Sequence, residues 1–128
     1  MRSIIIDTSF WLLPFERKVD IFEQMERLLE EPFVAVVPAP VLSELGAMAR
    51  GVGRRAIAAR GALSLIEKKK GKWLEIDPQR GAADGVIITV ALQRGAIVAT
   101  TDSGLRRRLN GKKVNCITLR DLHKVDFA

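Results

Sequence analysis

Short runs of apolar residues recur along the chain and are separated by longer segments of mixed polarity. Five of these runs are rich in β-branched residues and mostly lack alternating polar positions. That pattern is typical of strands that are buried on both faces of a parallel sheet. The predicted strands are Ile4–Ile6, Phe33–Val37, Trp73–Ile76, Ile97–Thr100 and Val114–Thr118.

The segments between the strands have helical periodicity. A helix over Val19–Leu29 places its apolar residues on one face. Pro40 suits the first turn of a helix that runs to about Arg50. The segment Gly81–Arg94 is apolar on nearly every side, so we expect a buried helix there. Two further helices are predicted, one between Gly53 and about Lys70 and a short one over Leu105–Leu109.

Strands that alternate with helices indicate parallel pairing through right-handed crossovers. The predicted fold class is therefore α/β, a three-layer α/β/α sandwich around a central parallel sheet of four to five strands. With 128 residues, 48% of them apolar, the chain can fill one hydrophobic core. It contains no linker or repeat, so we expect a single domain over residues 1–128.

The sequence also suggests a cellular compartment. No apolar run approaches the roughly 20 residues that span a bilayer. The acidic Asp7 follows the first residues too closely for a signal peptide. A single cysteine, Cys116, cannot form an internal disulfide. We expect a cytoplasmic protein with no membrane association.

The formal net charge of +6 is unevenly distributed. Residues 50–72 contain eight Lys or Arg and one acid, whereas residues 16–31 contain six acids and three bases. A basic field of this kind attracts polyanions, and nucleic acid is the partner it favours. The alternative is a thermostable protein with a solvated charged surface, which the presence of only two Asn and three Gln would suit.

Four acids follow predicted strands that are far apart in sequence. In an open parallel sheet the carboxyl ends of all strands lie along one edge, where ligands bind. Asp7 directly follows the first strand and Asp102 follows the fourth. Glu44 and Asp84 lie early in the helices that come after the second and third strands. The topology therefore predicts that these four carboxylates converge at one edge.

Each of these acids also has a purely structural interpretation. Asp7 and Asp102 are each placed to cap a helix or turn. Glu44 lies at the margin of a helix face, where a solvated Glu is common. Asp84 would share a face with apolar residues and need a partner, or it would favour a helix N-terminus through the macrodipole. Among the other acids, Asp77 precedes a proline and is better explained as part of a turn.

Four like charges in one pocket repel one another unless cations lie between them. Hard divalent cations bound through oxygen solve this problem, which favours one or two ions of Mg²⁺ or Mn²⁺. A zinc site would need His123 and Cys116, whose spacing matches no common zinc motif.

With these residues, the chain resembles a known family, the PIN domain nucleases. The motifs that carry the resemblance are Ile4-Ile5-Ile6-Asp7-Thr8-Ser9, Pro40-Val41-Leu42-Ser43-Glu44-Leu45, Ala83-Asp84-Gly85-Val86-Ile87-Ile88 and Ile97-Val98-Ala99-Thr100-Thr101-Asp102. Each motif is short, but their order and spacing fit over essentially the whole chain.

The resemblance implies a metal-dependent endoribonuclease that acts on single-stranded or structured RNA. It implies that Asp7, Glu44, Asp84 and Asp102 bind Mg²⁺ or Mn²⁺, and that Thr100 helps to hold the acidic cluster. It further implies a homodimer, and either a toxin paired with a small antitoxin protein or an RNA-processing enzyme. Ser9 and Thr101 depart from the family pattern, because Asn is commoner at both positions.

The basic residues nearest to this edge are the candidates for RNA contact. Arg106, Arg107 and Arg108 follow Asp102 within two helical turns, and Arg54 and Arg55 could extend the track. A solvated cationic helix face is the alternative for each group.

Two other functions are considered. A phosphoaspartate-type phosphatase has a second aspartate two residues after the first, and Ser9 occupies that position here. A PIN-like module that binds RNA or protein without cleavage would be expected to lose one or more of the four acids, and all four are present.

Overall fold

The computed structural model describes all 128 residues and contains one six-stranded sheet in the order β3-β2-β1-β4-β5-β6. The first five strands pair in parallel, and β6 pairs antiparallel with β5. The strands are β1 (Arg2–Ile6), β2 (Phe33–Pro38), β3 (Leu74–Asp77), β4 (Ile97–Ala99), β5 (Cys116–Arg120) and β6 (Lys124–Phe127).

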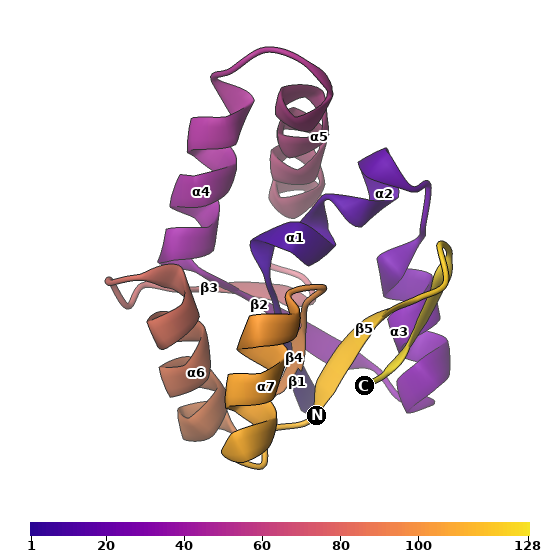
Figure 1. Cartoon of the computed structure of the whole chain (residues 1–128), viewed down its shortest axis with the longest axis vertical. Helices are drawn as coiled ribbons and strands as arrows, with labels where there is room; N and C mark the ends of the chain where they lie inside the picture. Colours follow the sequence, from indigo (N-terminus) through magenta and orange to yellow (C-terminus); the bar gives the residue numbers. More distant parts are fainter.

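Seven helices connect the strands (Figure 1). In Figure 1, α6 and α7 lie in front of the sheet, and the α4–α5 hairpin extends beyond it. The helices are α1 (Thr8–Trp11), α2 (Leu13–Glu16), α3 (Ile21–Leu29), α4 (Ala39–Ala49), α5 (Arg54–Lys69), α6 (Ala83–Arg94) and α7 (Ser103–Gly111).

The predicted α/β fold and the five parallel strands are confirmed. The sequence prediction omits β6, α1 and α2, which are each only four residues long. Strand β6 has one fully buried side chain, Val125, so it lacks the apolar run that identifies the other strands. The prediction that the Gly81–Arg94 helix is buried on nearly every side is wrong, because Leu92 is half exposed and Gly85 and Thr89 face solvent.

The core is one contiguous cluster of apolar side chains from both faces of the sheet. The three isoleucines of β1 are fully buried, as are Phe10 and Trp11 of α1. Sequence periodicity assigns these residues to the interior because a central parallel strand is covered on both sides. No helix of the structure is both long enough and apolar enough to cross a bilayer.

Helix α5 packs closely on α2 at Gly61. A Cβ built on Gly61 would lie 2.6 Å from Cδ1 of Phe15, so no larger residue fits without displacing that ring. The contact anchors the α4–α5 hairpin to the segment that follows β1 (Figure 1).

The chain reverses direction across the sheet between β1 and β4. From β1 it proceeds to β2 and β3 on one side, and from β4 it proceeds to β5 on the other. Such a switch point opens a crevice at the carboxyl ends of the two central strands. Residues that directly follow β1 and β4 are therefore placed at the natural ligand site of this fold.

Candidate active site

Asp7 lies at the switch point, immediately after β1. Its backbone N–H donates to the carbonyl of Ala99 on β4 (2.9 Å), which fixes its position between the two central strands. Its carbonyl accepts the N–H groups of Phe10 and Trp11 and so begins α1. The side chain is only 8% exposed.

The carboxylate of Asp7 is held by neutral donors. Oδ1 accepts the backbone N–H of Thr8 (2.8 Å). Oδ2 accepts the hydroxyl groups of Thr100 (2.7 Å) and Ser9 (3.3 Å). No Lys, Arg or His lies within ion-pair distance of either oxygen. Burying a charge without a cationic partner costs free energy, and the carboxylate of Asp7 is such a charge.

Burial is the main cause of a raised pKa at Asp7, because desolvation disfavours the charged carboxylate. The negative charge of Asp84 raises the pKa of Asp7 further. The hydrogen bonds from Thr100, Thr8 and Ser9 act in the opposite direction and lower it. The net shift is upward. Asp84 contributes to it although Arg108 lies 3.9 Å from that carboxylate, whereas Asp7 itself has no cationic neighbour.

Thr100 connects the two central strand ends. Its hydroxyl is fully buried, donates to Asp7 and accepts the backbone N–H of Asp102 (3.0 Å). In the same loop, the backbone N–H of the next residue, Thr101, donates to the hydroxyl of Ser9 (3.2 Å). Ser9 therefore forms hydrogen bonds with both Asp7 and the β4–α7 loop. It does so although its side chain is shorter than the Asn that is commoner at this position in the family that the sequence resembles.

Glu44 and Asp84 approach the same edge from α4 and α6. The exposed carboxylate of Glu44 accepts the hydroxyl of Thr8 (2.5 Å), which links it to the residue beside Asp7. Asp84 is 47% exposed and lies 3.9 Å from the guanidinium of Arg108. The expectation of a carboxylate directed into apolar surroundings is wrong, because side chains in the first turn of a helix point beyond its N-terminal end.

Asp102 is exposed and caps α7, its Oδ1 accepting the N–H of Leu105 (3.1 Å). Asp7 has a similar capping role at α1. The structural interpretations of these two acids therefore hold alongside their position at the strand ends. No three acidic, His or Cys side chains lie close enough together to enclose a metal ion. The acids lie along one edge of the sheet, where hydrogen bonds of Thr8 and Thr100 connect most of them, and they do not surround a single point.

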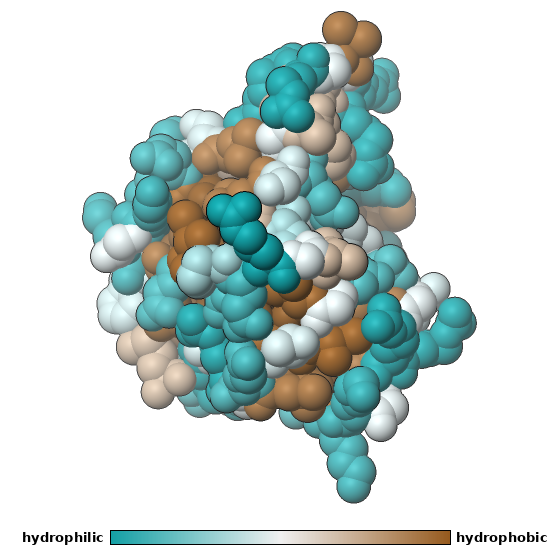
Figure 2. Space-filling model, turned by 90° about the vertical axis from the view of Figure 1, so that its left-hand side faces the viewer, coloured by the Kyte–Doolittle hydropathy of each residue, from teal (hydrophilic) through white to brown (hydrophobic).

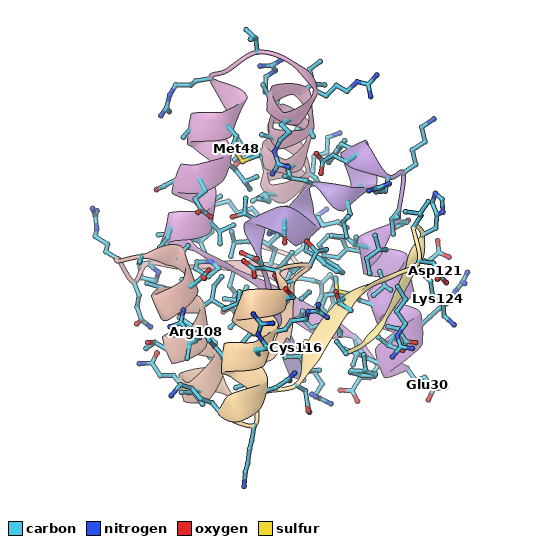
Figure 3. The ribbon with its side chains drawn as sticks, viewed as in Figure 1. Glu30, Met48, Arg108, Cys116, Asp121 and Lys124 are labelled. Carbon is cyan, nitrogen blue, oxygen red and sulfur yellow. The ribbon has the colours of Figure 1, made fainter.

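The predicted RNA-contacting arginines divide into two groups. Arg107 and Arg108 are exposed on α7, and Arg108 extends toward α6 (Figure 3). Arg106 is partly buried, and its Nε has no hydrogen-bond partner. Arg54 and Arg55 begin α5 on the extended hairpin, where Arg55 lies 3.8 Å from Glu16. Only the α7 group adjoins the acids.

Asp77 ends β3 and is as buried as Asp7, with 6% exposed. It accepts the N–H of Gln79 (3.0 Å), as expected of a turn before a proline, and its Oδ2 lies 3.5 Å from Nη2 of Arg94. Arg94 also lies 3.0 Å from Glu75, so Asp77 has a cationic partner that it shares with a second acid.

Two residues beside the acids were absent from the sequence prediction. Thr8 holds Glu44, and its place in the Asp7-Thr8-Ser9 motif was the available signal. Arg80 lines a pocket that also contains Glu44, and no local pattern marks it.

Fold and site together define a class of protein. Residues 4–122 match the family model described as "PIN like domain", so the chain belongs to the PIN-like domain family. The family match favours the nuclease interpretation over the phosphoaspartate phosphatase.

Individual relatives agree with this assignment. The chain is 27% identical over 124 residues to the protein named Ribonuclease VapC4 of Methanocaldococcus jannaschii, covering 94% of this chain and 92% of that one. It is similar to the solved PIN domain endonuclease Utp24, with a TM-score of 0.77, 25% identity and coverage of 98% and 90% of the two chains. A domain of a functionally unknown protein of M. jannaschii shares the fold, with a TM-score of 0.73, 17% identity and coverage of 97% and 95%.

Proposed function

We propose that this chain is an endoribonuclease that depends on Mg²⁺ or Mn²⁺ and acts through Asp7, Asp84, Glu44 and Asp102. One observation carries the proposal: a buried aspartate at the switch point has no cationic partner and is repelled by a second carboxylate. The name of the ribonuclease relative supports RNA as the substrate, and that of the endonuclease relative supports cleavage within a strand.

The donor atoms at this edge suit hard divalent ions, because every acidic side chain offers oxygen. Several of these oxygens have unused acceptor capacity. Oε2 of Glu44 and Oδ2 of Asp102 accept no hydrogen bond, and Oδ1 of Asp7 accepts only one. Mg²⁺ commonly binds through one or two carboxylates and keeps several waters. A loose edge of acids therefore fits one or two hydrated ions.

In this mechanism Asp7, Asp84 and Asp102 would be the main ligands of the ion, and Glu44 would bind it or position its water. A divalent ion bound there would make a water molecule more acidic and neutralise charge on the phosphate. Thr100 keeps the Asp7 carboxylate oriented through its 2.7 Å hydrogen bond. Hydrolysis would leave a 5′-phosphate and a 3′-hydroxyl, as the family resemblance implies.

Arg107 and Arg108 are the proposed phosphate contacts, because they are exposed on the helix that follows Asp102. Arg108 also lies 3.9 Å from Asp84, which places a cationic group directly beside the acids. Several phosphate contacts would make binding weaken steeply with salt, and a flat salt response would remove these arginines from the interface.

Two alternative biological roles are proposed. A toxin with a small antitoxin partner and an RNA-processing enzyme would use the same centre, in each case as a cytoplasmic homodimer. A small reading frame for a DNA-binding antitoxin beside this gene would favour the toxin.

The test is incubation of defined single-stranded RNA with the protein in Mg²⁺, in Mn²⁺ and in chelator. We expect cleavage with either ion, none with chelator, and none from Asp7→Asn. Asp121→Asn is the matched control, because Asp121 lies in the β5–β6 turn outside the site, and it should cleave normally. RNA binding without cleavage under every condition would instead support the inert PIN-like module.

A further inference from the structure

A pocket of about 620 Å³ opens beside the proposed catalytic edge. It lies between the start of α4, the end of β3 and the segment that leads into α6. Its lining is Ala39, Pro40, Ser43, Glu44, Ile76, Pro78, Arg80, Gly81 and Ala83. Figure 2 shows the side of the molecule that carries α4 and α6, where apolar surface is bordered by hydrophilic side chains.

Glu44 belongs both to this pocket and to the catalytic edge. Its carboxylate lines the pocket and also accepts the hydroxyl of Thr8, the residue next to Asp7. An RNA strand with one phosphate at Asp7 must continue in some direction, and the pocket is the adjoining cavity that shares a residue with that site.

The pocket has the chemistry of a base-binding site. Pro40, Ile76 and Pro78 supply apolar surface for the face of a base. Ser43 offers a hydroxyl that makes no hydrogen bond within the protein. A volume of about 620 Å³ falls in the range of small-ligand pockets, roughly 300–1,000 Å³.

Arg80 supplies the cation and the flat surface. Its side chain is exposed and makes neither an ion pair nor a hydrogen bond with the rest of the protein. Proteins that read unpaired RNA stack the extruded bases on aromatic rings or on arginine guanidinium planes. The pocket has no aromatic lining residue, so Arg80 is the group that can provide this plane.

We infer that this pocket binds one unpaired nucleotide next to the scissile phosphate, with its base against Pro40, Ile76 and Pro78 and beside Arg80. The inference rests on the proposed ribonuclease function and adds to it a preference for unpaired RNA at one position. Ser43 lines the pocket with a free hydroxyl that can contact the polar edge of that base.

The test measures RNA binding separately from cleavage. All variants are made in the Asp7→Asn background, and the affinity for a fluorescein-labelled single-stranded RNA is measured by anisotropy in chelator. Ser43→Leu fills part of the pocket from an exposed helix position without adding an aromatic ring, and Arg80→Ala removes the guanidinium. The matched controls are Ala47→Leu, one turn further along α4, and Arg50→Ala, at the end of that helix.

We expect Ser43→Leu and Arg80→Ala to weaken binding about tenfold, the loss typical of one stacked base, while both controls bind as the parent does. A single abasic nucleotide moved along the RNA should weaken parent binding at one position and have no further effect in Arg80→Ala. Equal affinities for all five proteins, or equal losses in all four variants, would overturn the subsite.

The two proposals fail in different ways. Metal-dependent cleavage by the wild type, together with unchanged binding in Ser43→Leu and Arg80→Ala, would overturn the subsite and leave the ribonuclease intact. A wild-type protein that neither binds nor cleaves RNA would overturn both.

Discussion

Two buried aspartates at strand ends, Asp7 and Asp77, are treated differently by the protein. Both are less than a tenth exposed. Asp77 receives a backbone N–H and shares the guanidinium of Arg94 with Glu75, so its charge has a cationic partner. Asp7 receives only neutral donors and is repelled by Asp84. Burial alone therefore does not mark a functional carboxylate, whereas a buried charge left without a cation does.

Their places in the sheet explain the difference. Asp77 ends β3, an outermost strand of the sheet, where Arg94 at the end of α6 can reach it. Asp7 follows β1 at the centre, where the strand order reverses and where ligands bind in open parallel sheets. The protein itself supplies a cation to the first carboxylate but none to the second.

Outside the four acids, the largest effect on cleavage is expected from the hydroxyl that supports Asp7. Thr100→Val keeps the shape of the side chain but removes its hydrogen bonds to Asp7 and Asp102. We expect RNA cleavage to fall by about 10–100-fold, as is usual when an outer partner of a metal site is lost. Thr118→Val, a buried threonine of β5, is the control. Equal cleavage rates for the two variants would remove Thr100 from the site.

Asp77→Asn should affect stability instead of cleavage. The variant loses its charge interaction with Arg94, and we expect the free energy of unfolding to fall by about 1–3 kcal/mol in urea denaturation. RNA cleavage should stay at the wild-type rate. A large loss of cleavage with unchanged stability would reverse the roles assigned to the two aspartates.

A smaller effect is expected for the pH dependence of stability without metal. The pKa of Asp7 is raised by burial, so this group stabilises the fold fully below about pH 3.9, the ordinary Asp pKa, and loses that contribution as pH rises through its folded-state pKa. Asp7→Asn removes this loss. We expect the variant to be as stable as the wild type or more so at neutral pH, with unfolding measured in chelator from pH 4 to 8. Parallel stability curves would show that Asp7 pays no desolvation cost.

The sequence predicts the central features of this fold because buried parallel strands leave continuous β-branched runs. It also predicts which acids follow those strands. It does not predict the degree of exposure of Asp84, because helical spacing cannot tell whether a side chain in a first turn projects past the sheet. The sequence likewise does not predict the pocket at Arg80. Glu44 and Arg80 line the same pocket only because α4 folds against the β3–α6 segment.

The hydrogen bond between Asp7 and Thr100 is a second feature that the sequence does not predict in detail. The family resemblance implies that Thr100 supports the acids, and the structure gives the atoms: one hydroxyl joins Asp7 to the backbone of Asp102. Sequence spacing alone does not indicate that a single hydroxyl would serve both strand ends.

The most direct measurement is calorimetric titration of Mn²⁺ into the wild type, Asp7→Asn and Asp77→Asn. If the uncompensated charge of Asp7 creates the metal site, the wild type and Asp77→Asn should bind Mn²⁺ alike, and Asp7→Asn should bind it more than about tenfold more weakly. Equal Mn²⁺ affinity in Asp7→Asn and the wild type would contradict the central claim.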